Sequence, residues 1–137
     1  MLNRNEPIAI HQLMNRFEQG DMSLLDQVAD DIHLSIDHFN HNADTGWQRC
    51  AGKQDLVRVL TRLAEEVFPK GTKFTHLSTR ALGEQWYLTK LEQKFWYGLE
   101  QQEVKGESFI LSHETDGKVD YFKETVTAVI PLQSYVA

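Results

Sequence analysis

The sequence contains a single cysteine and no long apolar run. Because Cys50 is the only cysteine among 137 residues, no internal disulfide can form. No apolar stretch reaches the ~18 residues that a membrane-spanning helix needs, and residues 1–7 lack the apolar core of a signal peptide. We therefore expect a cytoplasmic protein without a membrane segment.

Several motifs that identify common enzyme classes are also missing. There is no glycine-rich phosphate loop, no Gly-x-Ser-x-Gly turn, no His-Glu-x-x-His helix and no cysteine pair. Nucleotide-dependent, serine-hydrolase and cysteine-ligated metal chemistry are thereby disfavoured, and we expect no cofactor. The 14 basic residues are outnumbered by 20 acidic ones, giving a net charge of −6, so a basic patch for nucleic acid or an anionic membrane is not expected. We therefore expect a small molecule or another protein chain as the binding partner, rather than nucleic acid or a membrane.

The N-terminal half shows helical patterns. Ile10, Leu13, Met14 and Phe17 have the spacing of one apolar helix stripe, which predicts a helix over residues 7–20. A short helix is expected over residues 23–29, where Ser23 and Asp26 resemble a capping box. The alternation Ile32, Leu34, Ile36 predicts a strand, and residues 52–68 show the clearest helical pattern of the chain.

The C-terminal half of the sequence predicts a sheet of long strands. Residues 72–82, 85–98, 103–115 and 118–130 are rich in β-branched and aromatic residues, and Asp116-Gly117 is a typical hairpin turn. A strand of ~13 residues would span ~40 Å, which is wider than a domain of this size, so the sheet must bend through bulges. Residues 1–137 are therefore expected to form one α+β domain, with a curled antiparallel sheet wrapped around the N-terminal helices.

This order of elements resembles the nuclear transport factor 2-like (NTF2-like) superfamily, and in particular its SnoaL-like and ketosteroid-isomerase-like branch. The resemblance runs from about Pro7 to Val129. The matching pieces are Phe17-Glu18-Gln19-Gly20-Asp21, Val28-Ala29-Asp30-Asp31-Ile32, Gly52-Lys53-Gln54-Asp55-Leu56, Gly83-Glu84 and Asp116-Gly117-Lys118-Val119.

The resemblance implies a cone-shaped or barrel-like, cystatin-like fold, with a pocket between sheet and helices. It also implies a homodimer packed through the sheet. Members of the superfamily include isomerases, cyclases, dehydratases, epoxide hydrolases and non-catalytic binding or association modules. Function therefore has to be argued from the site.

Asp37 and His38 form the first candidate site, because ketosteroid isomerases carry their proton-shuttling carboxylate near the end of the matching strand. Side chains alternate along a strand, so if Ile36 faces the pocket, His38 does too and Asp37 faces away. A bulge would reverse this. Histidine suits proton transfer because its ordinary pKa is about 6.5. The alternatives are a polar strand end with hydrogen-bonded histidines, and a metal site of Asp37, His38 and His41, which no ligand spacing supports.

Glu124 is the second catalytic candidate. A two-residue turn at Asp116-Gly117 pairs Thr115 with Lys118 and would place Glu124 opposite Phe109, on one face with Phe122. A carboxylate on a covered apolar face has a raised pKa, as in general acids. The alternative is a dimer interface or edge, with Glu124 ion-paired to a lysine of the neighbouring strand, either Lys90 or Lys94.

The remaining candidates are ligand-contacting residues. His76 matches a histidine that many SnoaL-like proteins carry, although Thr79 stands where those proteins have asparagine. Large rings on or beside the strands could wall a pocket for a flat apolar ligand or pack the core and dimer: Trp47, Tyr87, Trp96, Phe109 and Phe122. By the resemblance, Tyr87 or Tyr97 could donate a hydrogen bond to a developing oxyanion.

The sequence leaves two functions open: small-molecule binding with cofactor-free acid–base chemistry, and a non-catalytic homodimeric association module.

Overall fold

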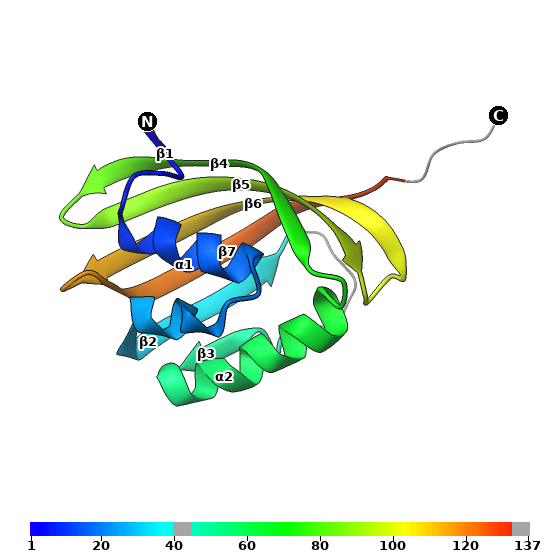
Figure 1. Ribbon diagram of the computed structural model, residues 1–137, viewed down its shortest axis with the longest axis horizontal. Coiled ribbons are helices and arrows are strands. Elements are labelled where there is room, and N and C mark those ends of the chain that lie inside the picture. Colours follow the sequence, from blue (N-terminus) through cyan, green and yellow to red (C-terminus); the bar gives the residue numbers. More distant parts are fainter. Residues whose placement is uncertain (40–44, 133–137) are drawn as a thin grey trace.

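The computed structural model describes residues 1–39 and 45–132, and in this part of the chain it is built on one sheet of seven strands (Figure 1). In spatial order the strands are β1 (Leu2–Asn3), β4 (Thr72–Gly83), β5 (Trp86–Tyr97), β6 (Gln102–Thr115), β7 (Lys118–Pro131), β2 (Val28–His38) and β3 (Arg49–Ala51). The four long C-terminal strands are confirmed. At the β6–β7 turn both Asp116 and Gly117 have positive φ, as a two-residue hairpin turn requires.

The sheet is mixed rather than antiparallel throughout. β2 pairs with β7 in parallel, from Val28 beside Val119 to His38 beside Val126. The chain returns to this edge only after α2 and four further strands, so a parallel pairing needs no tight turn. The sheet does not close into a barrel, and the short β1 that pairs with β4 was not expected from the sequence.

The expected curl is present and has identifiable causes. Register shifts interrupt the β4–β5 ladder twice and the β6–β7 ladder twice, the latter between Glu107 and Ser108 and between His113 and Glu114. Such bulges insert one extra residue in one strand and increase the local twist. The long strands therefore arch around one side of the molecule in Figure 1, as the sequence predicted.

The helical segments all lie on that one side of the sheet (Figure 1). They are α1 (Ala9–Glu18), the 3-10 helix η1 (Met22–Gln27), α2 (Lys53–Arg62) and the π-helical turn η2 (Leu63–Val67). The short helix is capped by Asp21, whose side chain accepts from the Ser23 N–H at 2.9 Å, so the predicted capping box with Asp26 is wrong. No helix in residues 1–39 and 45–132 is long and apolar enough to cross a membrane.

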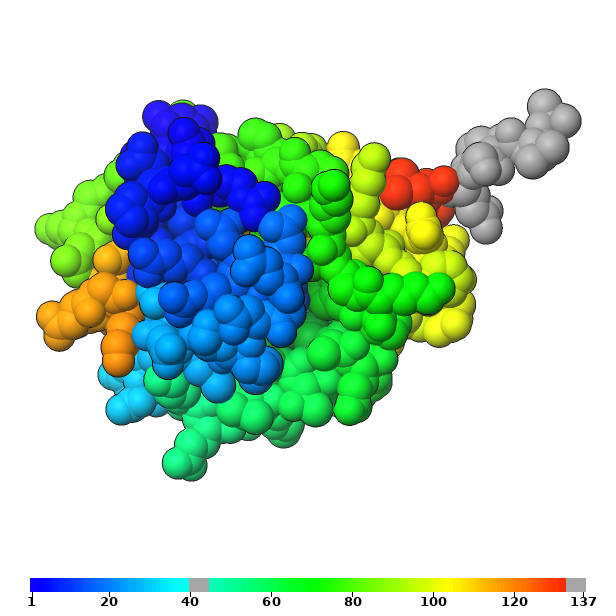
Figure 2. Space-filling view, viewed as in Figure 1, coloured from blue at the N-terminus to red at the C-terminus, as the bar shows by residue number. Residues whose placement is uncertain are grey.

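The core lies between these helices and the sheet. Buried apolar residues come from α1, α2 and every long strand, among them Ile10, Leu56, Leu91 and Ile110. In Figure 2 the segments coloured blue (α1 and η1) and green (α2) cover the face toward the viewer. The helices thus shield the concave side of the sheet from solvent, and side chains that point to that side are enclosed.

Candidate functional site

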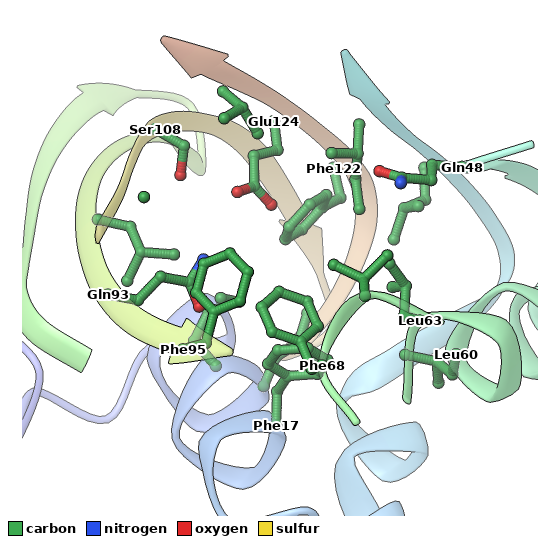
Figure 3. Close-up of a pocket in the computed structure, with 18 of the residues that line it drawn as sticks. Phe17, Gln48, Leu60, Leu63, Phe68, Gln93, Phe95, Ser108, Phe122 and Glu124 are labelled. Atoms are coloured by element: carbon green, nitrogen blue, oxygen red, sulfur yellow. The ribbon is translucent and has the colours of Figure 1, made fainter. Parts of the chain in front are cut away.

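A cavity of about 90 Å³ lies between the concave side of the sheet and the helices, and we call it the central cavity (Figure 3). A single water needs only ~10–15 Å³ of such space, so the cavity has room for several waters or a small organic molecule. Most of its lining is apolar and comes from α1, α2, η2 and strands β2, β5, β6 and β7. Its polar side chains include His38, Gln48, Gln93, Ser108 and Glu124.

Glu124, on β7, points into this apolar space (Figure 3). Only 7% of its surface is exposed, and neither Lys nor Arg lines the cavity among the described residues. Burial raises the pKa of Glu124 from 4.5 to about 7, and the neighbouring Ser108 hydroxyl opposes the rise more weakly. The carboxyl therefore changes charge near neutral pH, which suits a group that both donates and accepts a proton.

A bulge places Glu124 on this face. The predicted pairing of Thr115 with Lys118 is correct, but the register shifts by one residue between His113 and Glu114. Glu124 is consequently opposite Ile110, and the predicted pairing with Phe109 is wrong. The alternative of an ion pair with Lys90 or Lys94 does not occur, because those lysines lie on exposed positions of β5 and Glu124 is enclosed.

His38 and Asp37 diverge as the side-chain alternation predicts. His38 follows Leu34 and Ile36 into the lining of the central cavity. Asp37 points to the opposite face, where it forms an ion pair with Arg49. Asp37 is thus away from the cavity, and the predicted proton transfer by Asp37 has no geometric support.

Gln48 joins His38 at the same end of the cavity. Gln48 is 1% exposed, and its side-chain oxygen lies 3.3 Å from His38 Nε2. Its backbone carbonyl accepts from the Ile36 N–H at 2.9 Å, which extends the β2–β3 pairing by one position. The sequence places Gln48 in a loop of polar residues, so only knowledge of the strand pairing reveals that it faces inward.

The aromatic wall of the cavity consists of Phe17, Phe68 and Phe95 (Figure 3). The ring of Phe68 lies 5.5 Å from that of Phe17 and 4.5 Å from that of Phe95, centroid to centroid. Phe17 belongs to the apolar stripe predicted for the first helix. Phe95 alternates with lysines along β5, and that alternation was the available signal that it faces inward.

Five predicted ligand-contacting or pocket-wall residues lie outside the cavity lining, and Phe122 lies within it. The ring of Trp47 is covered by the Arg62 guanidinium and that of Trp96 by the Lys70 ammonium.

The other predicted residues outside the lining lie on the strands. His76 is exposed and hydrogen-bonded to Ser78, and Phe109 is 41% exposed on the outer face of the sheet. Tyr87 is half-buried beyond the lining, whereas Tyr97, the other predicted oxyanion donor, is part of the lining.

No group of three or more potential metal-ligating side chains occurs in residues 1–39 and 45–132. His41, which the metal alternative requires, lies outside the described residues. The described lining offers instead the enclosed carboxyl of Glu124, the imidazole of His38 and uncharged amide and hydroxyl groups. It also includes Glu107, whose carboxylate is ion-paired with Lys105 at 3.6 Å.

Comparison with solved structures identifies the architecture. An NTF2-like protein from Anabaena variabilis superimposes with a TM-score of 0.68 at 15% identity, covering 88% of this chain and 87% of that one. This chain has the NTF2-like fold. No protein-family model matches the sequence, and no curated protein does either.

Two further structures with the NTF2-like fold have names that indicate activities. A Mesorhizobium loti protein described as a SnoaL-like polyketide cyclase has a TM-score of 0.57 at 13% identity, with coverage of 85% of this chain and 94% of that chain. An LEH-like epoxide hydrolase from M. tuberculosis has a TM-score of 0.59 at 16% identity, with coverage of 86% and 79%. Identities this low support the fold that the sequence predicted, and the chemistry has to come from the cavity.

Proposed function

We propose that the central cavity binds a small, uncharged, mostly apolar molecule and that Glu124 exchanges a proton with it without a cofactor. The observation that carries this proposal is the enclosed Glu124 carboxyl on an apolar wall, with a pKa raised to about 7. Strongly perturbed titratable groups in cavities are typical of functional sites. The reaction class is proton transfer, as in isomerisation, cyclisation or dehydration.

The lining favours an uncharged ligand. An anionic ligand would find neither Lys nor Arg in the described lining and would be repelled by Glu124 once this carboxyl is ionised. Apolar groups from the helices and the sheet would surround the body of the molecule and exclude water from the carboxyl. Proton transfer then depends on Glu124 alone or together with His38, another titratable side chain of the cavity lining.

The names of two neighbours agree with this reaction class. One is named as a polyketide cyclase and the other as an epoxide hydrolase, and general acid–base groups can assist both kinds of reaction. For the present chain they support a substrate class and no particular substrate.

The proposal is tested by hydrogen–deuterium exchange at the carbons next to the carbonyl of cyclohexanone, in D₂O buffer, followed by NMR. We expect the protein to accelerate exchange, with a rate that rises through about pH 7 as Glu124 ionises. Glu124→Gln should lower the protein-dependent rate ~100-fold or more, because general acid–base groups contribute at least that much.

The matched control for this test is Glu103→Gln, which neutralises an exposed carboxylate on β6 and should leave the rate unchanged. A wild-type protein that does not accelerate exchange contradicts the catalytic half of the proposal. Equal rates for wild type and Glu124→Gln would assign the activity to another group.

A second candidate function, homodimeric association, is favoured by the outer face of the sheet. Leu88 and Phe109 are 37% and 41% exposed there, and Leu111 lies directly across from Leu88. Charged residues surround this apolar patch, and Lys105 already pairs with Glu92 within the chain at 3.5 Å. Because the patch is continuous across β5 and β6, we propose that a second copy of the chain packs on it about a two-fold axis.

Light scattering during size-exclusion chromatography tests the dimer. We expect a dimer for the wild type and a monomer for Phe109→Lys, with Leu82→Lys, at an exposed position of β4, as the control that stays dimeric. A monomeric wild-type protein at high concentration would contradict the association function. The cytoplasmic location and the absence of nucleic-acid and membrane partners stay predictions from the sequence.

A further inference from the structure

Gln48 presents a buried hydrogen-bond donor that has no partner among the described residues. Its side-chain nitrogen is enclosed and makes no hydrogen bond within residues 1–39 and 45–132, while its side-chain oxygen is engaged with His38 Nε2. A buried donor without a partner loses its hydrogen bond to water and gains none in return, so such groups are uncommon in folded proteins unless something else satisfies them. Here the amide belongs to the lining of the central cavity (Figure 3).

Gln48 and Glu124 lie in one row across the sheet. Glu124 pairs with Ile36 on the neighbouring strand, and the Ile36 N–H in turn bonds to the Gln48 carbonyl. All three side chains line the cavity, so they point to the same side. Two strand spacings separate the outer members, which puts their Cα atoms roughly 10 Å apart. A small ring lying over Ile36 would span the space between the amide and the carboxyl.

We propose that the Gln48 amide holds a carbonyl-type oxygen of the molecule on which Glu124 acts. This proposal rests on the proposed function and specifies its ligand: an uncharged, mostly apolar ketone or aldehyde, bound with its oxygen toward β3 and its reacting carbon toward β7. Gln48 is therefore a binding and positioning residue, and Glu124 moves the proton.

The chemistry of the free group selects the ligand. Because the Gln48 oxygen accepts from the His38 Nε2–H, the amide is oriented with its N–H₂ group left to donate. A donor inside an apolar cavity is satisfied by an acceptor, and a carbonyl oxygen is an acceptor that carries no charge and no proton of its own. A carboxylate would also accept, but it would bring an uncompensated negative charge close to Glu124.

Tyr97 is the competing donor, since its buried hydroxyl also lines the cavity and burial raises its pKa to about 12, which keeps it protonated. Its position argues against the role. Tyr97 pairs with Gln102 at one end of β6, whereas Glu124 pairs with Ile110. Those two positions of β6 are eight residues apart, which corresponds to roughly 26 Å along the strand, whereas Gln48 and Glu124 are separated by only two strand spacings.

The arrangement supports a balanced proton transfer. Ionised Glu124 takes a proton from the carbon next to the carbonyl, and the electron pair of that C–H bond moves into a new C=C bond while the carbonyl π pair moves to oxygen. The resulting enolate oxygen is stabilised by the Gln48 N–H. Return of the proton from Glu124 to carbon, at the same or a conjugated position, regenerates the carboxylate.

The test compares two probes of the same shape, cyclohexanone and methylenecyclohexane, which differ by oxygen against CH₂. Binding is followed by NMR shifts of cavity methyl groups, and the C=O stretching frequency of bound cyclohexanone by infrared difference spectroscopy. For the wild type we expect tighter binding of the ketone and a lowered C=O frequency. Gln48→Leu should lose about three- to tenfold in ketone affinity, keep its affinity for methylenecyclohexane, and shift the C=O frequency upward.

Two further variants make the result decisive. Gln48→Met repeats the removal of the amide with a flexible side chain, in case leucine packs badly, and Gln54→Leu at an exposed position of α2 is the matched control. If Tyr97→Phe, rather than Gln48→Leu or Gln48→Met, shifts the C=O frequency, the assignment to Gln48 is wrong while the proposed function stands. If neither probe binds the wild type, the proposed function fails and this inference fails with it.

Discussion

Replacing Glu124 by glutamine should change how the stability of the protein depends on pH. Burial raises the pKa of Glu124 from 4.5 in the unfolded chain to about 7 in the fold. Below about pH 4.5 the carboxyl is protonated in both states and imposes no ionic cost. As pH rises from 4.5 to 7 the unfolded state loses its proton first, so the free energy of unfolding decreases. Above pH 7 the full difference applies, which corresponds to about 3 kcal/mol.

Glutamine has nearly the same shape and cannot ionise, so Glu124→Gln should lack this loss. Urea unfolding followed by tryptophan fluorescence at pH 5 and pH 8.5 measures the effect. The advantage of Glu124→Gln over wild type should grow by about 2–3 kcal/mol between the two pH values. Any fixed cost of the buried amide cancels, because only the change with pH is compared. Glu103→Gln, at an exposed position, should show no such trend. A difference between wild type and Glu124→Gln that does not vary with pH would refute the reasoning.

Three other predictions follow from individual contacts. Gly98→Ala should lower the free energy of unfolding by about 2 kcal/mol or more in urea titrations, because a Cβ at that position would lie 2.0 Å from the Glu66 carbonyl oxygen. Asp37→Asn removes a partly exposed ion pair with Arg49 and should cost less than about 1 kcal/mol while leaving cyclohexanone exchange unchanged; a large loss of exchange would return Asp37 to the site. Burial lowers the pKa of His11, so the unfolded state takes up a proton first and the free energy of unfolding should fall as pH drops below 6.5. In urea titrations of a protein that already carries Glu124→Gln, adding His11→Gln should flatten that decline.

The long strands and their curl could be predicted from the sequence because both follow from composition and length. The turn at Asp116-Gly117 was also readable, since few dipeptides adopt two positive φ values. The parallel edge formed by β2 was not, because strand pairing between distant segments depends on the whole arrangement of the chain.

Whether a side chain of the candidate site faces the cavity could be predicted only where the alternation along the strand is unbroken. The one irregularity in the β2–β7 pairing lies between Val28 and His33, and the pairing is regular from there to His38, so the predicted inward direction of His38 is correct. The predicted cross-strand partner of Glu124 was wrong because one extra residue near His113 shifts the β6–β7 pairing, and no residue type in the sequence marks that bulge. Glu124 still faces an apolar environment, on the concave face where the bulge directs it.

Most of the aromatic residues predicted to line the pocket lie outside it, for a different reason. A large ring on a strand packs on either face, so its type alone does not say which side it occupies. Trp96 and Phe95 are neighbours, yet Phe95 lines the cavity and Trp96 lies under Lys70 on the other side. Gln48 carried no signal in the sequence at all, because its inward direction depends on its backbone bond to Ile36.

The most direct test of the central claim is a measurement of the pKa of Glu124 itself. Carboxyl ¹³C signals of glutamate, recorded by NMR between pH 4 and pH 9, can be assigned by the signal that disappears in Glu124→Gln. The proton-transfer function proposed for the central cavity requires this signal to titrate near pH 7. A Glu124 signal that titrates below pH 5 would show a solvated or paired carboxylate and would contradict the account.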